Sequence, residues 1–232
     1  LEQAGIHVVY GILGFKTHTK ISLVVRKEKG KLRNYFHIGT GNYNSNTSRF
    51  YTDIGLLSTD PDISSDLIEL FNYLSGFSKQ KTYQKLLVSP TSLRKKFIFL
   101  INREIENAKK GKKSEIIAKM NSLVDPEIIQ LLYLASQTGV KINLIIRGIC
   151  CLYPQRKNLS ENITVISVIG HFLEHSRIFW FYNNNDSEVF IGSADWMRRN
   201  LDRRIEAVTP IEDLELKSQL YDLLQTYIPV SY

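Results

Sequence analysis

Two stretches of the sequence each place a histidine two residues before a cation, at the head of an apolar run. The first holds His18 and Lys20, and the second holds His175 and Arg177. In an extended strand, residues i and i+2 point to the same face, so each histidine and its cation would lie side by side. Imidazole is a good nucleophile toward phosphorus and a good acid or base near pH 7, and a neighbouring cation stabilises phosphoryl charge. The pattern therefore predicts a phosphoryl-transfer site.

Each of these two stretches is also the start of a longer unit, and the two units have the same order of motifs. The strand after His18 leads through a turn and a second strand to HIGTGNYN at 37–44, and the strand after His175 leads in the same way to FIGSADWM at 190–197. Both segments contain the pattern G-[Ser/Thr]-x-[Asn/Asp]. In the first unit, Asn42 occupies the last position of this pattern. Backbone N–H groups and hydroxyls at such turns suit phosphate oxygens. Two related units predict that both histidines meet in one cleft.

The elements around these motifs alternate between strand and helix spacing, which predicts an α/β chain with an internal repeat. We expect one domain over residues 1–88 and a second over residues 89–232. Strands are predicted at residues 6–13, 20–27, 32–39, 115–120, 140–146, 163–168, 176–182 and 188–192. Helices are predicted at residues 62–77, 91–111, 125–138 and 213–227.

Composition narrows the classes of function. A chain of 232 residues that is 43% hydrophobic can bury a large core, and its net charge of +7 favours an anionic partner such as a nucleotide, a nucleic acid or a polyphosphate. The lysines of 108–113 read as a solvated loop. No run approaches the roughly 18 apolar residues of a membrane helix. The start at Leu1, without methionine, indicates a piece of a longer protein.

The only two cysteines, Cys150 and Cys151, are adjacent. They cannot form a disulfide framework, which indicates a reducing cytoplasm. We expect them to be buried at the end of a strand rather than to bind a metal.

Three further features allow more than one interpretation. HFLEH at 171–175 fits the H-x-x-E-H zinc motif, but that motif needs a helix and this segment lies between strand-like runs. Arg147 ends an apolar strand, where it could pair with a carboxylate or reach a ligand. Tyr51 could be a core aromatic or could stack on a base. Arg203 and Arg204 precede Glu206, and at least one of them is expected to pair with it.

The motifs, taken together, resemble the C-terminal half of the bacterial polyphosphate kinases, which is built of two phospholipase-D-like α/β domains. The resemblance extends from end to end of the chain. The stretches that carry it are KTHTKISLVVRKE (16–28), YFHIGTGNYN (35–44), RFYTDIGLL (49–57), NLIIRGICCL (143–152), FLEHSRIF (172–179) and IGSADWMRRNLDRRIE (191–206).

The resemblance implies reversible transfer of the ATP γ-phosphate to inorganic polyphosphate through a phosphohistidine. His18 would be the histidine that carries the phosphate, and His175 would be the second catalytic histidine, acting as acid or base. Tyr51, Arg147 and His175 would bind ATP, and Arg204 would be a further phosphate contact. Lys20, Arg177 and Asn42 complete the phosphate-binding set that the residues themselves suggest.

The resemblance also implies Mg²⁺, with its main ligands outside these residues and none within them. It implies ATP, ADP and polyphosphate rather than nucleic acid as partners, a homo-oligomer, and a cytoplasmic location with peripheral membrane association left open. We expect the 232 residues alone to fold but to be inactive or nearly so.

Two rival functions stay open from the residues. The phosphodiesterases of the phospholipase D type follow H-x-K-x₄-D, and the acid position is occupied here by Val25 in the first half and by Tyr182 in the second. That departure weakens the phosphodiesterase interpretation. The other rival is a polyanion-binding module whose histidines only assist binding.

Overall fold

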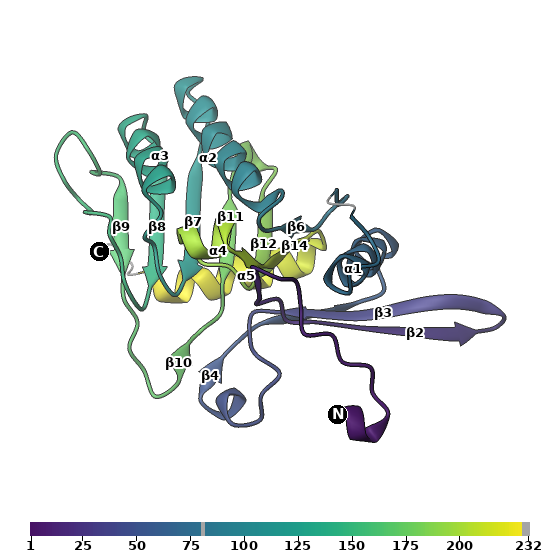
Figure 1. Cartoon of the computed structure of the whole chain (residues 1–232). Helices are drawn as coiled ribbons and strands as arrows, with labels where there is room; N and C mark the ends of the chain where they lie inside the picture. The colour runs from purple at the N-terminus through teal and green to yellow at the C-terminus, as the bar shows by residue number, and fades with distance from the viewer. Residues whose placement is uncertain (80–81, 229–232) are drawn as a thin grey trace.

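A seven-stranded sheet forms the centre of the fold in the computed structural model, which describes residues 1–79 and 82–228. The strand order is β6-β14-β12-β11-β7-β8-β9 (Figure 1). In that order the strands are Leu87–Val88, Ala207–Ile211, Glu188–Gly192, Ile178–Phe181, Glu115–Met120, Lys141–Ile146 and Ile163–Ile166. β7, β8 and β9 are parallel, and the other neighbours are antiparallel.

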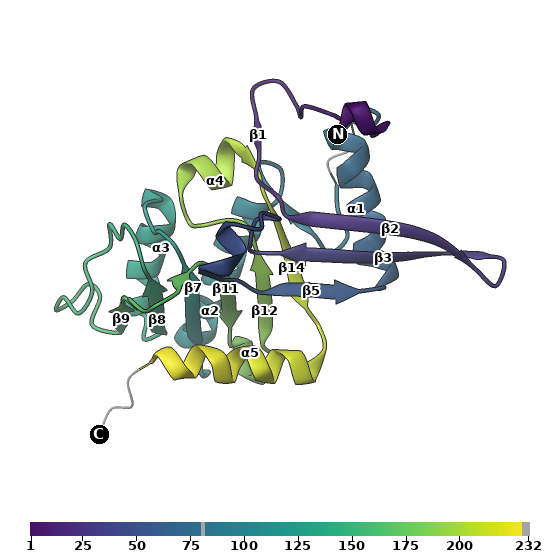
Figure 2. The same cartoon turned by 90° about the horizontal axis from the view of Figure 1, so that it is seen from below.

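Helices cover both faces of this sheet because its strands are apolar on both sides. α2 (Leu93–Lys109) and α3 (Pro126–Gln137) lie on one face, and α5 (Leu214–Tyr227) crosses the other (Figures 1 and 2). Successive residues of β7 divide between the two layers. Ile116 and Ala118 pack into the cluster that contains α2 and α3, whereas Ile117 packs against α5.

A smaller sheet is built from the first quarter of the chain. It contains β2 (Ile21–Glu28), β3 (Lys31–Gly39) and β5 (Gly55–Ser58), all antiparallel. α1 (Pro61–Leu74) covers one face, where Phe36 and Ile38 are buried. Lys29 and Gly30 both have positive φ, 48° and 80°, which is the geometry of a tight hairpin turn.

Two short parallel strand pairs join the part of the chain that holds the small sheet to segments that precede β14 and β11 of the large sheet. β1 (Lys16–Thr17) pairs with β13 (Arg204–Ile205), and β4 (Tyr51–Thr52) pairs with β10 (Leu173–Glu174). Between β12 and β13, α4 (Arg198–Asp202) carries the chain toward the first of these pairs. The segments that hold the two histidines are thus placed by strands from the opposite half.

The α/β fold class is confirmed, and the predicted strands and helices are present within a few residues, with one exception. Residues 6–13 are not a strand, although they read as one, because they pair with no other segment in the described part of the chain and a strand needs a partner. The expectation of buried cysteines is wrong for Cys151, which is exposed, and Cys150 is only half-buried. The division at residue 88 stays a prediction.

None of the helices in residues 1–79 and 82–228 is long and apolar enough to cross a membrane.

Candidate functional site

His18 follows β1 and is held by a carboxylate from the far end of the chain. Its backbone N–H donates to the carbonyl oxygen of Ile205 at 2.9 Å, which continues the β1–β13 pairing by one residue. Its ring Nδ1 lies 2.8 Å from Oε2 of Glu206, a side chain with no exposed surface. The pairing of the two strands therefore places this histidine directly against this carboxylate.

His175 repeats the arrangement with the two halves exchanged. Its backbone N–H donates to the carbonyl oxygen of Thr52 at 3.1 Å, which continues the β4–β10 pairing. Its ring Nδ1 lies 2.8 Å from Oδ1 of Asp53. Each histidine is thus oriented by a carboxylate that the other half of the chain supplies, and neither half forms a complete pair alone.

A buried hydroxyl fixes each carboxylate in turn. Thr40 donates to Oδ1 of Asp53 at 2.6 Å, and Ser193 donates to Oε2 of Glu206; hydroxyl and carboxylate are 13 residues apart in both cases. Asn200 donates to the other oxygen of Glu206. The expectation that these hydroxyls face phosphate is therefore wrong, because they are already used to hold the carboxylates.

These contacts determine which ring nitrogen of each histidine carries its proton. A carboxylate can only accept, so Nδ1–H donates to it, and in the neutral ring Nε2 keeps its lone pair. Nε2 of His18 has no hydrogen-bond partner among the described residues, and the side chain is 21% exposed. Nε2 of His175 lies 3.0 Å from Nη1 of Arg177, which donates to it. The free nitrogen of His18 is therefore available as a nucleophile.

Arg177 is buried and links the second histidine to its surroundings. Its Nη1 also donates to the carbonyl oxygen of His175 at 2.8 Å, and its Nε donates to Oδ1 of Asp195 at 3.1 Å. Burial lowers the pKa of His175, and this outweighs the opposing hydrogen bond to Asp53. Burial raises the pKa of Asp53, but its bonds from His175 and Thr40 outweigh this and hold that pKa below its usual value. His175 is therefore neutral at pH 7, beside an ionised carboxylate.

Lys20 lies next to His18, as the strand spacing predicts, but it is almost fully buried. Its Nζ donates to the carbonyl oxygen of His18. Burial lowers the pKa of Lys20 to about 8; Glu206 opposes this shift, and the charges of Arg177 and Arg204 add to it. This cation therefore titrates close to physiological pH, which no spacing argument could predict.

Tyr51 and Arg147 line a surface pocket beside the second histidine. The ring centroid of Tyr51 is 4.9 Å from that of His175. Nε of Arg147 donates to Oδ1 of Asn121 at 2.5 Å, so this arginine is held by an amide rather than by a carboxylate. Phe172, which is half exposed, also lines the pocket. The three residues to which the family resemblance gives ATP binding, Tyr51, Arg147 and His175, thus lie close together.

Two of the other predicted site residues, Asn42 and Arg204, make fewer contacts with the histidines and their carboxylates. The Asn42 side chain is exposed and makes no hydrogen bond within the described residues. Arg204 is half-buried, and the expected ion pair of Arg203 or Arg204 with Glu206 is wrong, because Glu206 bonds to His18 instead. Arg204 still lies close enough to lower the pKa of Lys20.

The H-x-x-E-H stretch is not a zinc motif. Its glutamate, Glu174, lies in β10 rather than in a helix, and Oε2 accepts from Lys119 at 3.0 Å, Tyr227 at 3.0 Å and Thr52 at 3.2 Å. These donors lie on β7, α5 and β4, so Glu174 ties three elements together immediately before His175. No described group of three His, Cys, Asp or Glu residues could hold a metal ion.

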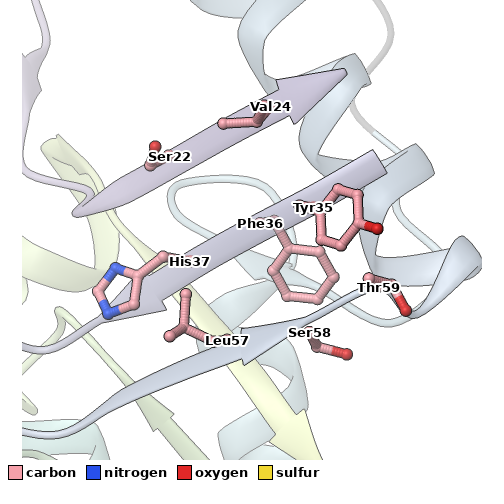
Figure 3. Close-up of a pocket in the computed structure, with 8 residues that line it drawn as sticks. All are labelled: Ser22, Val24, Tyr35, Phe36, His37, Leu57, Ser58 and Thr59. Carbon is pink, nitrogen blue, oxygen red and sulfur yellow. The ribbon is translucent and has the colours of Figure 1, made fainter. Parts of the chain in front are cut away.

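His37 supports the first glycine turn from the open face of the small sheet. Its Nδ1 lies 2.6 Å from the hydroxyl of Tyr43, and its ring occupies the space that a side chain at Gly55 would need. Figure 3 shows this ring beside Leu57 on the uncovered face. His37 therefore packs against the glycines of the small sheet rather than against the apolar core.

Family models match the chain in two adjacent parts. The model described as polyphosphate kinase C-terminal domain 1 matches residues 1–80, and that of C-terminal domain 2 matches residues 86–229. A polyphosphate kinase of Prochlorococcus marinus (strain MIT 9313) is 67% identical over 228 residues, which are 98% of this chain and 32% of the relative. One of Dictyostelium discoideum is 50% identical over 98% of this chain and 22% of its own length. The chain thus spans a third or less of these curated relatives.

One solved structure gives the same family, and a second shares the fold. The crystal structure of polyphosphate kinase from Porphyromonas gingivalis superposes with a TM-score of 0.91 and 41% identity, over 97% of this chain and 35% of that chain. A mutant of yeast tyrosyl-DNA phosphodiesterase superposes with a TM-score of 0.52 and 13% identity, over 84% of this chain and 66% of that chain. The second likeness is one of fold alone.

Proposed function

The chain belongs to the polyphosphate kinase family, and we propose that it carries the histidines with which the whole protein moves phosphate reversibly between ATP and inorganic polyphosphate. The observation that carries this proposal is the free Nε2 of His18, directed by Glu206 and set beside a buried cation. A nucleophile without its proton, a carboxylate that stabilises the positive ring, and a cation for phosphoryl oxygens are what this reaction requires.

In the first step, Nε2 of His18 bonds to the γ-phosphorus of ATP while the bond to the bridging oxygen breaks, and ADP leaves with the electron pair. The imidazole then carries phosphate on Nε2 and a proton on Nδ1, so its ring is positive. Glu206 is placed to stabilise that charge, because its buried carboxylate already accepts from Nδ1. Lys20 and Arg177 are assigned as the cations that stabilise the oxygens in transfer.

In the second step, the terminal phosphate of the growing chain attacks the phosphorus on His18, and the N–P bond breaks. A protonated terminal phosphate must lose its proton to become a good nucleophile. His175 is suited to accept it, because the ring is neutral and Arg177 is the one donor to its Nε2 among residues 1–79 and 82–228. We therefore assign His175 as the base in this direction and as the acid in reverse.

ATP is proposed to bind with its base near Tyr51 and its phosphates near Arg147 and the histidines. We further propose that Mg²⁺ binds together with ATP, because substrate phosphates supply several of the Mg²⁺ ligands in such enzymes. Asp53 and Glu206 each already bond a histidine, so they are poorly placed as ligands, and no step above depends on the ion.

The rate of His18 phosphorylation is expected to fall as the pH rises above about 8, because Lys20 then loses the proton that gives it its charge. The fall should approach tenfold per pH unit in kcat/KM for ATP, measured between about pH 6 and pH 10. Lys20→Met should be slow at every pH and should lose this dependence. A wild-type profile that stays level to pH 10 contradicts the assignment.

A phosphodiesterase of the phospholipase D type remains the rival enzyme, and a polyanion-binding module the non-catalytic one. To test all three, full-length protein is incubated with γ-labelled ATP and Mg²⁺ and the bound label is analysed. We expect a label that survives base, is lost in acid and maps to His18 in a peptide digest. ATP consumption without label would contradict the phosphohistidine route and favour the phosphodiesterase. If neither label nor ATP consumption is seen, metal-independent cleavage of a nucleic acid or a lipid would favour the phosphodiesterase, and no cleavage would favour the binding module.

For the whole protein, we further propose ATP, ADP and polyphosphate rather than nucleic acid as partners, a homo-oligomeric state, and a cytoplasmic location with or without peripheral membrane contact. The net charge of +7 supports a polyanionic partner.

A further inference from the structure

The closed end of the β2–β3 hairpin is a strongly charged exposed segment on the same hairpin that begins beside His18. Residues 26–33 contain five cations and one acid, a net charge of +4 within eight residues, against +7 for the whole chain. The cations are all exposed: Arg26, Lys27, Lys29, Lys31 and Arg33. In Figures 1 and 2 this end of the hairpin extends beyond α1 and lies apart from every other element.

The charges within this segment are not balanced by its neighbours. Arg26 and Arg33 face each other directly across the two strands, an arrangement of like charges that destabilises a sheet. Both lie near the ring of Tyr35, at 5.9 and 5.3 Å, and share Glu28, at 3.5 and 3.9 Å. Across residues 1–79 and 82–228, no carboxylate lies within ion-pair distance of the three lysines at the tip. Glu28 thus serves the two arginines, and the three lysines have no counter-anion in the described part of the chain.

Packing does not explain the length of the hairpin either. Val25 and Leu32, near its tip, are 53% and 75% exposed, and the opposite face around Val24 and Leu57 is also open (Figure 3). An isolated two-stranded ribbon is at best marginally stable in water. The five cations therefore lie on the end of a hairpin that contributes little to the hydrophobic core.

β2 begins immediately after Lys20, so the hairpin is a direct continuation of the segment that holds His18. Its eight residues, at about 3.3 Å each, place the tip roughly 25 Å from the start of the strand. An anion that reaches both ends must be long, flexible and charged throughout its length. Inorganic polyphosphate, with a negative charge on each phosphate, has these properties.

Accordingly, we propose that the tip of the β2–β3 hairpin is an auxiliary binding surface for long-chain polyphosphate, separate from the transfer site. This inference rests on the proposed function for its choice of ligand. It predicts that the hairpin retains long chains and leaves short ones unaffected, since a tripolyphosphate at the histidines cannot reach the tip.

The chain offers a matched control. Residues 109–113 contain four lysines and no acid, also a net charge of +4. They link the end of α2 to the start of β7, whereas Asn121 and Arg147 follow the ends of β7 and β8, so this loop lies at the sheet edge opposite the site. The two clusters have equal charge and differ in their position relative to the histidines.

The test compares two triple variants of the full-length protein: Lys27→Gln/Lys29→Gln/Lys31→Gln in the hairpin and Lys110→Gln/Lys112→Gln/Lys113→Gln in the control loop. At low salt, the hairpin variant should bind long-chain polyphosphate about tenfold more weakly, with a shallower salt dependence. Its affinity for tripolyphosphate, and its labelling of His18, should stay within twofold of wild type. The control should match wild type in every assay.

Equal affinity of wild type and hairpin variant for long chains would overturn the proposal, as would an equal loss in the control. An equal loss for tripolyphosphate would overturn it too, because the charge would then act at the transfer site. A single-stranded oligonucleotide is the third probe: a loss confined to it would make the hairpin a nucleic-acid surface instead. These are binding measurements, so they remain decisive even if no phosphohistidine forms.

Discussion

Glu206→Gln is expected to slow the phosphorylation of His18 by ATP about a thousandfold, because loss of one charge from a buried ion pair costs about 3–5 kcal/mol. The substitution is nearly isosteric, so it separates charge from shape. Oδ1 of Asn200 is buried without a partner in the described residues, so this amide can turn and accept from the new glutamine. The glutamine oxygen can then still face His18, and the loss is mainly that of the negative charge.

The measurement is the rate at which label from γ-labelled ATP accumulates on His18 in a rapid-quench experiment. Glu215→Gln, an exposed change on α5, is the control and should label at the wild-type rate. Thermal unfolding of each variant separates a lost charge from a lost fold. If Glu206→Gln remains folded and labels within threefold of wild type, Glu206 serves only to hold the strands together.

The residue types that do the chemistry could be read from the sequence because they recur in a fixed order. His18 with Lys20, and His175 with Arg177, lie in extended three-residue segments between two strands, and the i, i+2 spacing of such a segment places each pair close together. The helix over 213–227 and the hairpin turn at Lys29–Gly30 follow from apolar spacing and turn chemistry in the same way. Local sequence patterns were sufficient to predict a feature wherever the residues that form it are close together in the sequence.

The carboxylates could not be assigned in this way, because their partners lie more than a hundred residues away. Glu206 is 188 residues from His18, and Asp53 is 122 residues from His175. The signal that could have found them is the equal spacing of 13 residues from Thr40 to Asp53 and from Ser193 to Glu206. The H-x-K-x₄-D pattern does not locate these acids, because it places the acid shortly after each histidine and each acid here belongs to the other half of the repeat.

The misread strand at 6–13 has a related cause. Apolar residues with β propensity form a strand only where another strand offers hydrogen bonds, and propensity does not reveal that. The buried state of Lys20 is likewise a property of the assembled fold. Burial lowers its pKa, the charges of Arg177 and Arg204 add to this shift and Glu206 opposes it, and all three residues lie far from Lys20 in sequence.

His175→Ala is expected to trap the phosphate on His18. Removing a general base slows the step that needs it by about 10²- to 10⁴-fold. In the proposed mechanism that step is the attack of the terminal phosphate on phospho-His18, whereas the departure of ADP needs no proton. The variant should therefore still take label from ATP, more slowly because Tyr51 and Arg177 lose a neighbour, and should release it to polyphosphate far more slowly than wild type.

A chase experiment measures this directly: His18 is first labelled, ATP is removed, and unlabelled polyphosphate is added. Asp53→Asn should give a weaker form of the same defect, since the carboxylate acts only through the ring that it orients. His7→Ala, an exposed histidine outside the site, should lose its label as fast as wild type. If His175→Ala instead slows labelling and release by the same factor, the ring acts by binding phosphate in both steps. The base must then be sought elsewhere, with water or the substrate's own oxygens as the remaining acceptors.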